Sequence, residues 1–190
     1  KASDMTPQQL ATLKAAIAAQ TDAGFADLRA SGATGAMADW YNVEATPAHS
    51  VWGTSVAVNA INDAIDFAAY TPNGTIDGTA AVTNRQLAAQ TKLMSLQHPM
   101  MGRETLNCSK ARVRGGLLDA VMNLPTGNNG AIQSAGGVDG SRVMTALTRP
   151  ATRGEKLFTL AAVTTGTVSA FRLTLEGNFT NEDIVLALAA

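Results

Sequence analysis

The stretch Thr148–Phe158 reads Thr-Arg-Pro-Ala-Thr-Arg-Gly-Glu-Lys-Leu-Phe and combines apolar residues, basic residues and a proline. When residues are placed at intervals of about 100°, a helix from about Ser141 to Ala161 gathers its apolar and small residues on one broad face. Those residues are Val143, Ala146, Leu147, Pro150, Gly154, Leu157, Phe158 and Ala161. Pro150 removes one helical hydrogen bond, so we expect a bend there. The pattern predicts a long helix anchored in the core.

A narrow basic stripe lies beside this apolar face. Its members are Arg142, Arg149, Arg153 and Lys156. One interpretation is a solvated helix edge, because basic side chains are usually exposed. The other is that the stripe meets acidic groups of a neighbouring subunit, or phosphates. The chemistry is that of an interaction surface rather than an active site, so these four are the candidate interaction residues.

Length and composition favour one domain over residues 1–190 that meets other proteins. The chain has 190 residues, close to the size of a single domain of about 100 to 150 residues. Charged residues make up 15% of the chain, against roughly 25% in average soluble proteins. This low charge predicts a surface covered by neighbours, and the net charge of -1 argues against broad attraction to nucleic acid. No apolar run approaches the roughly 18 residues that cross a bilayer, so we expect no membrane partner.

Capping signals and apolar spacing predict a mainly helical fold. Thr6, Pro7 and Gln9 form a helix start, and that helix should run to about Gln20. A second helix is expected over about 22–29, followed by a surface loop, and further helices begin near residues 59, 83 and 109. Thr180, three residues before Asp183, caps a final short helix.

Two other segments complete the predicted fold. Phe171, Leu173 and Leu175 alternate with polar residues, which predicts a short β strand or hairpin near the C-terminus. The stretch of about 124–140 is rich in glycine and asparagine, which indicates a flexible loop or arm that an ordered partner could fix.

Few residues could support catalysis or hold a cofactor. His49 and His98 lack a carboxylate, cysteine or second histidine at metal-ligand spacing, so both are interpreted as structural. Cys108 is the only cysteine and is expected to be a core residue. Both tryptophans, Trp40 and Trp52, are expected to anchor the fold. We expect no enzyme activity, no cofactor and no metal.

Four segments carry a resemblance to a known family. They are Met5–Ala15, Thr46–Ala48 leading into Val51–Val56, Ala151–Phe158 and Leu175–Thr180. In these segments the chain resembles a family of small proteins encoded in the structural gene blocks of tailed bacteriophages, near the capsid and neck genes. The resemblance implies a shared fold and a role in the virion. It carries no catalytic residues, and the chain departs from the family pattern at Gly32–Tyr41 and Thr126–Gly137.

The resemblance makes a head-to-tail adaptor the favoured function. Such a protein forms a homo-oligomeric ring on the portal, contacts tail or neck proteins and touches packaged DNA only passively. It belongs to the virion and is assembled in the cytoplasm of the host bacterium. A capsid decoration or tail-completion protein is the alternative. A small hydrolase and a DNA-binding module are further options, the latter resting on the basic stripe and on Lys110, Arg112 and Arg114.

Overall fold

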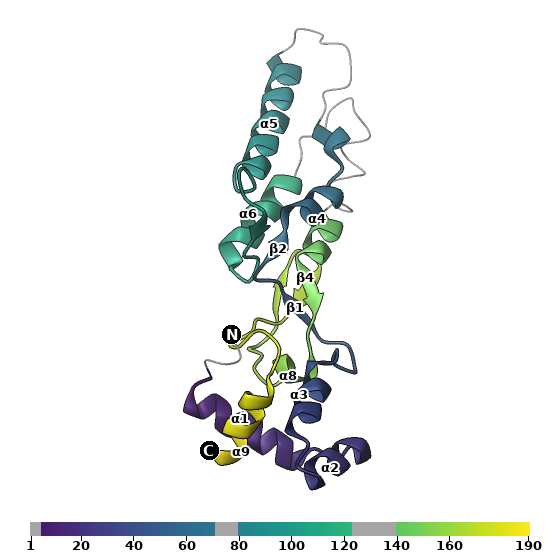
Figure 1. The fold of residues 1–190 in the computed structure, drawn as a ribbon. Helices are drawn as coiled ribbons and strands as arrows, with labels where there is room; N and C mark the ends of the chain where they lie inside the picture. Colours follow the sequence, from purple (N-terminus) through teal and green to yellow (C-terminus); the bar gives the residue numbers. More distant parts are fainter. Residues whose placement is uncertain (1–4, 71–79, 123–139) are drawn as a thin grey trace. The chain divides into compact units, whose positions relative to one another are not determined.

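The structure is a computed structural model that describes residues 5–70, 80–122 and 140–190 (Figure 1). The described residues are mainly helical, with short strands that pair in twos, so the predicted fold class is confirmed. They group into two compact units. The terminal unit comprises residues 1–51, 150–162 and 170–190, and the central unit comprises 52–149 and 163–169. Because this grouping reflects contacts alone, a single folding domain stays a prediction.

The described part of the terminal unit contains five helices and a common apolar core. The helices are α1 (Pro7–Ala19), α2 (Ala23–Ala30), α3 (Thr34–Asn42), the short α8 (Arg153–Lys156) and α9 (Asn181–Ala189). The core collects Leu13, Ile17, Phe25, Met37, Tyr41, Phe158, Phe179 and Ile184. Residues far apart in the sequence therefore share one core.

The predicted capping signals at both ends of the chain are confirmed. Gln9 N donates to Thr6 Oγ1 over 3.3 Å, and Thr6 N donates to Gln9 Oε1 over 2.8 Å, which together form a capping box at the start of α1. At α9, Asp183 N donates to Thr180 Oγ1 over 3.2 Å, and Thr180 N donates to Asp183 Oδ2 over 2.7 Å. Both helices start where the sequence predicts.

Helix α3 replaces part of the surface loop that the sequence predicts after the second helix. Only Gly32 needs the left-handed conformation, at φ 68°, and α3 begins two residues later. Met37, Ala38 and Tyr41 then fall on one face of α3 and are buried in the core. The loop prediction is wrong because this apolar spacing outweighs the local glycine and threonine signals.

The prediction of one long helix from about Ser141 to Ala161 is also wrong. The structure has a helix over 140–146, strand β4 (Thr148–Pro150) and the separate helix α8. Pro150 has no N–H to donate and disfavours helical backbone at Arg149, so the chain is extended there. Thr152 then starts a new helix, since its Oγ1 accepts from Glu155 N over 3.1 Å.

Besides the helix over 140–146, the described part of the central unit contains further helices and a short strand pair. Strands β2 (Val56–Ala57) and β3 (Thr105–Leu106) are antiparallel. The remaining helices are α4 (Val58–Asp63), the 3₁₀ helix η2 (Phe67–Tyr70), α5 (Ala80–Gln97) and α6 (Ala111–Val121). Helices α5 and α6 lie side by side and are joined by a salt bridge of 2.9 Å between Lys92 Nζ and Asp119 Oδ2. The expected starts of α5 near Thr83 and of α6 at Ser109 are slightly misplaced.

Extended segments connect these helices. Strand β1 (Ser50–Trp52) pairs with β4, and β5 (Val163–Thr165) pairs with β6 (Val168–Ala170). The β5–β6 hairpin turns at Gly166, whose φ is 61°. The strand predicted around Phe171–Leu175 is thus displaced toward the N-terminus, and only isolated bridges occur at Phe171 and Leu173. The predicted arm at 124–140 lies outside the described residues except for Gly140.

Gly154 gives a direct test of the packing in the terminal unit. A Cβ atom at this position would lie 2.1 Å from Phe179 Cε2, so Gly154→Ala is expected to lower the free energy of unfolding by about 1–3 kcal/mol. Gly35 on α3 has no atom within 4 Å of an added Cβ, and Gly35→Ala is expected to raise stability by about 0.5–1 kcal/mol. Urea denaturation measures both changes, and equal effects of the two substitutions would contradict this packing.

Candidate functional site

The four basic residues predicted to form one stripe lie on different elements. Arg142 is on the helix over 140–146, where its Nη2 donates to Asp63 O over 3.3 Å, and Arg149 is in β4. Arg153 and Lys156 are on α8. The first two belong to the central unit and the last two to the terminal unit. The prediction that the four residues share one helix is therefore wrong. Their role in binding a partner stays a prediction.

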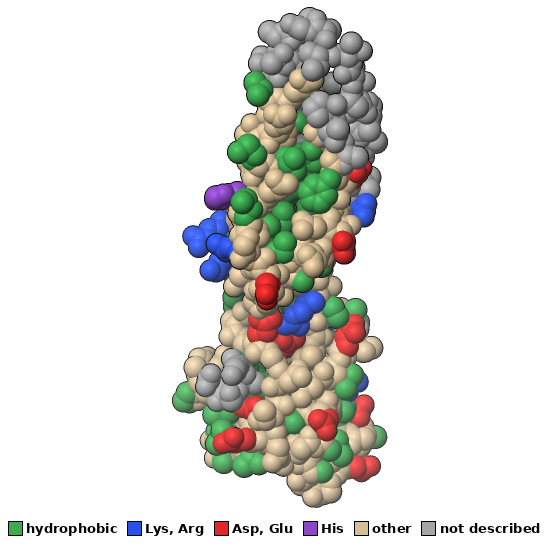
Figure 2. Space-filling model, turned by 45° about the horizontal axis from the view of Figure 1, so that its top comes forward, with side chains coloured by type: hydrophobic (Ala, Val, Ile, Leu, Met, Phe, Trp, Pro, Cys, Tyr) green, Lys and Arg blue, Asp and Glu red, His purple; other side chains and the backbone are tan. Residues whose placement is uncertain are grey.

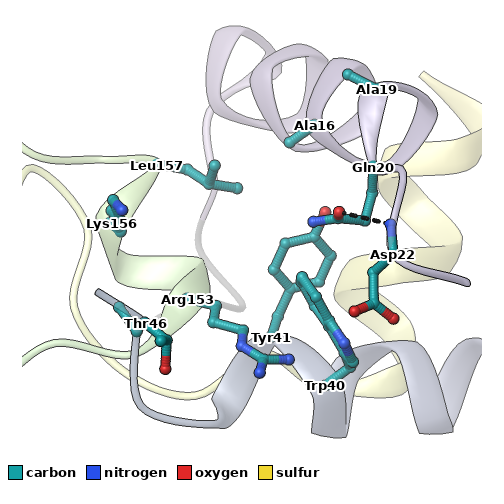
Figure 3. Close-up of a pocket in the computed structure, with 11 residues that line it drawn as sticks. Ala16, Ala19, Gln20, Asp22, Trp40, Tyr41, Thr46, Arg153, Lys156 and Leu157 are labelled. Carbon is teal, nitrogen blue, oxygen red and sulfur yellow. Dashed lines mark hydrogen bonds between the residues drawn. The ribbon is translucent and has the colours of Figure 1, made fainter. Parts of the chain in front are cut away.

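Arg153 and Lys156 both line a cleft of about 550 Å³ in the terminal unit. Its walls come from the end of α1, from α3 and from α8, and Figure 3 shows the side chains of these elements around it. The apolar part of the lining is formed by Ala16, Ala19, Trp40, Ala45 and Leu157. The cleft combines apolar walls with two cationic side chains.

Arg153 is held against an aromatic ring. Its guanidinium carbon lies 4.2 Å from the centroid of the Trp40 ring, a cation–π contact that fixes the plane of the charged group. Backbone contacts hold the start of α8, because Arg153 N donates to Val43 O over 2.8 Å. The sequence offers no local signal for this contact, because Trp40 and Arg153 are far apart along the chain.

An aromatic cluster fixes Trp40 in turn. The Trp40 ring lies 4.8 Å from Phe25 and 5.0 Å from Tyr41, measured between centroids. Tyr41 also packs edge-on against Phe25 and Phe179. Such pairs add about 0.5–1.5 kcal/mol beyond area burial. The expected anchoring role of Trp40 is confirmed, and the cleft has a rigid wall.

Tyr41 places a buried hydroxyl beside the cleft. The residue is 2% exposed, and its hydroxyl oxygen has no hydrogen-bond partner among the described residues. An unpaired buried hydroxyl costs about 1–3 kcal/mol. Burial raises the pKa of Tyr41 to about 12, so the group keeps its proton at neutral pH and remains a donor. Nothing in the local sequence marks this hydroxyl as buried without a partner.

His49 is half-buried in the terminal unit and packs against an aromatic ring. Its ring stacks on Phe171 with centroids 3.9 Å apart and an interplanar angle of 22°. Burial, followed by the positive charge of Lys156, lowers the pKa of His49, so the ring is neutral at neutral pH. The interpretation of His49 as structural agrees with this stacking.

Cys108 occupies a core position in the central unit, as the sequence predicts. Its side chain is fully buried, and Sγ donates weakly to Leu106 O over 3.7 Å. Burial raises the pKa of the thiol to about 11, although the nearby Arg114 charge acts in the opposite direction. The thiol is therefore protonated and a poor nucleophile at neutral pH.

Arg114 is buried in the central unit, although the DNA-binding option counts it in a basic patch. Its Nη1 donates to Cys108 O over 2.8 Å and to Ser109 O over 2.7 Å, and its Nε donates to Thr165 Oγ1 over 3.0 Å. The guanidinium also lies 4.5 Å from the centroid of Trp52, which is 1% exposed. Arg114 therefore organises the core and is not available to phosphates.

Large apolar side chains are exposed on one helix of each unit. On α5, Leu87 and Met94 are 55% and 70% exposed, and Met101 in the turn after α5 is 72% exposed. On α9, Val185, Leu186 and Leu188 are 41–47% exposed. Figure 2 shows hydrophobic side chains gathered on the visible face of the central unit. A contiguous apolar patch of several hundred Å² is a signature of protein interaction sites, whereas apolar residues exposed singly are common.

Comparison of the chain with models of known protein families, with curated proteins and with solved structures found no match. Within residues 5–70, 80–122 and 140–190, no helix has the length and apolar character needed to span a membrane. The same residues contain no group of three or more His, Cys, Asp or Glu side chains placed to hold a metal ion.

Arg114→Met tests the buried hydrogen-bond set. The substitution leaves two backbone carbonyls without their charged donor, so the free energy of unfolding should fall by about 2–4 kcal/mol. Arg112→Met on the same helix is the matched control, since Arg112 is exposed and should change stability by less than about 0.5 kcal/mol. Urea denaturation followed by tryptophan fluorescence measures both. A loss of similar size in the two variants would contradict the assigned role of Arg114.

The raised pKa of the Cys108 thiol predicts a loss of folding stability at alkaline pH. Its pKa is about 11 in the folded chain and 9.0 ordinarily, so the unfolded chain releases the thiol proton first as pH rises. The contribution of Cys108 is complete below pH 9 and is lost as pH rises through 11. Between those values the unfolding free energy of Cys108→Ala should decline less steeply than that of the parent. Parallel pH profiles would contradict the prediction.

Proposed function

We propose that this chain is a structural protein of a tailed-phage particle and acts as a head-to-tail adaptor that forms a ring on the portal. The observation that carries the proposal is the exposed apolar surface on α5 and α9. Each unit of the chain thus presents one apolar helix face. A protein that works through subunit packing needs such faces.

Two different faces on one chain suit a ring. When unlike surfaces meet from copy to copy, the contact is heterologous, and repeated rotation closes it into a ring. Covering an exposed Leu or Met side chain contributes up to about 1.5–3 kcal/mol when burial is complete. Each further residue that a neighbouring copy covers adds to the free energy of association. The low charge of the chain agrees with surfaces that neighbours cover.

Three of the segments that resemble the phage family lie in the terminal unit. Met5–Ala15 forms most of α1, Ala151–Phe158 contains α8, and Leu175–Thr180 leads into α9. They serve as caps and packing segments, which favours a role through shape. The expected partners are further copies of the chain, the portal and tail or neck proteins.

Self-association tests this proposal. The double substitution Met94→Gln and Met101→Gln keeps side-chain length but makes the apolar face around α5 polar, so association should weaken at least about tenfold. Leu160→Gln is the matched control because Leu160 is also exposed, at 43%, but lies outside both faces. Sedimentation velocity measures association, and incorporation into particles measures function.

The expected result is a folded double variant that stays monomeric and does not enter particles, beside a control that behaves like the parent. A double variant that assembles like the parent would contradict the role of the α5 face. A parent chain that remains monomeric and is absent from particles would contradict the adaptor function itself.

A further inference from the structure

We propose that the cleft lined by Trp40, Tyr41 and Arg153 binds a carboxylate carried by an acidic segment of a partner polypeptide. The proposal rests on the hydrogen-bonding groups that surround the cleft and on the shape of its walls. All of its lining residues belong to the terminal unit. The inference is independent of the virion role, because it concerns binding to a single copy of the chain.

The cationic groups of the cleft have unused donor capacity. Stacking on Trp40 occupies the face of the Arg153 guanidinium and leaves its N–H groups, which lie in the plane, directed outward. Within the described part of the chain, neither Arg153 nor Lys156 forms a salt bridge. Arginine held in a fixed plane is suited to a carboxylate, which accepts two parallel hydrogen bonds.

Two acceptor atoms beside the cleft already receive hydrogen bonds from the backbone. Gln20 Oε1 accepts from Thr21 N over 2.9 Å and from Asp22 N over 3.1 Å. Asp22 Oδ1 accepts from Phe25 N over 3.0 Å, which caps α2. In Figure 3 the Asp22 carboxylate lies on the opposite side of the Trp40 ring from Arg153. Among the lining residues, the two cations Arg153 and Lys156 outnumber the one carboxylate of Asp22, which leaves one net positive charge.

Tyr41 supplies a third donor at the wall of the cleft. Its hydroxyl is buried and lacks a partner in the described residues, so an incoming acceptor would satisfy a group that is otherwise left unpaired. The ring rises from α3 toward the end of α1 in Figure 3, which directs the hydroxyl into the region between these elements. This orphan donor distinguishes the cleft from a surface hollow with two basic residues on its rim.

The walls favour a carboxylate on an aliphatic stem. Ala16, Ala19 and Leu157 provide apolar contact for the methylene groups of a glutamate or aspartate side chain. Ala19, Thr46 and Lys156 are exposed, so the occupant can remain attached to a larger chain. A strongly hydrated phosphate dianion would gain little from these apolar walls. An acidic peptide is therefore the occupant that matches both the charge and the surface.

Peptide binding to the isolated protein tests the proposal. The probe is the capped peptide acetyl-Leu-Glu-Leu-Glu-amide, and its neutral counterpart is acetyl-Leu-Gln-Leu-Gln-amide. Nuclear magnetic resonance follows the indole N–H of Trp40 and the Nε–H of Arg153 during titration. We expect saturable shifts with the glutamate peptide and none with the glutamine peptide. Inorganic phosphate and a short single-stranded DNA serve as further arms.

Variants identify the groups that bind. Arg153→Gln should weaken the glutamate peptide about 10- to 100-fold, as expected for a lost charge-assisted hydrogen bond. Tyr41→Phe preserves the ring and removes only the hydroxyl, so it should weaken binding about 2- to 10-fold without loss of stability. Arg172→Gln removes the same charge from an exposed site outside the cleft and should change affinity by less than about twofold.

Three results would overturn the inference. One is equal binding of the glutamate and glutamine peptides, and another is saturation by phosphate or DNA with no response to the glutamate peptide. The third is a loss in Arg172→Gln as large as that in Arg153→Gln, which would show attraction to net charge alone. Because the monomer is titrated, none of these results depends on ring formation or on incorporation into particles.

Discussion

The buried carboxylate of Glu155 is the interaction on which the terminal unit depends. Glu155 is 3% exposed, and its Oε2 accepts from Thr152 N over 3.1 Å while its Oε1 accepts from Gly177 N over 3.1 Å. One oxygen thus completes the capping box that begins α8, and the other holds the segment that leads to α9. A charge in the core is tolerated only when such donors surround it. The Glu155 side chain therefore connects the start of α8 to the segment at Gly177, which is distant in the sequence.

The cleft follows from this constraint. Glu155 on α8 is buried in the terminal unit. The neighbouring Arg153 stacks on Trp40, and Lys156 is exposed at the cleft. Gly154 on α8 lies close to the ring of Phe179 in the aromatic cluster. A Cβ atom at position 154 would clash with that ring. The same four residues thus supply a cap, a core contact and two cations. Fold and candidate site share one short helix.

The sequence predicts what local chemistry controls. The capping boxes at Thr6 and Thr180, the mainly helical class and the burial of Cys108 are confirmed, because each depends on neighbouring residues or on strong residue preference. The long helix fails because helical periodicity continues through Pro150 on paper, whereas the backbone cannot. The sequence does not predict the stacking of Arg153 on Trp40 or the burial of Arg114 against Trp52. In each pair the two residues come together only in the tertiary structure. The sequence therefore predicts Arg153 and Lys156 as interaction residues, but it does not predict the cleft that surrounds them.

The proposed adaptor role makes the exposed apolar side chains of α5 and α9 contact surfaces between subunits. A reconstruction of phage particles assembled in the presence of this chain tests the proposal most directly. The account predicts copies arranged as a ring at the portal, with Leu87 and Met94 of α5 and the apolar face of α9 covered by neighbouring subunits. Particles that lack the chain, or copies in which both faces point into solvent, would contradict it.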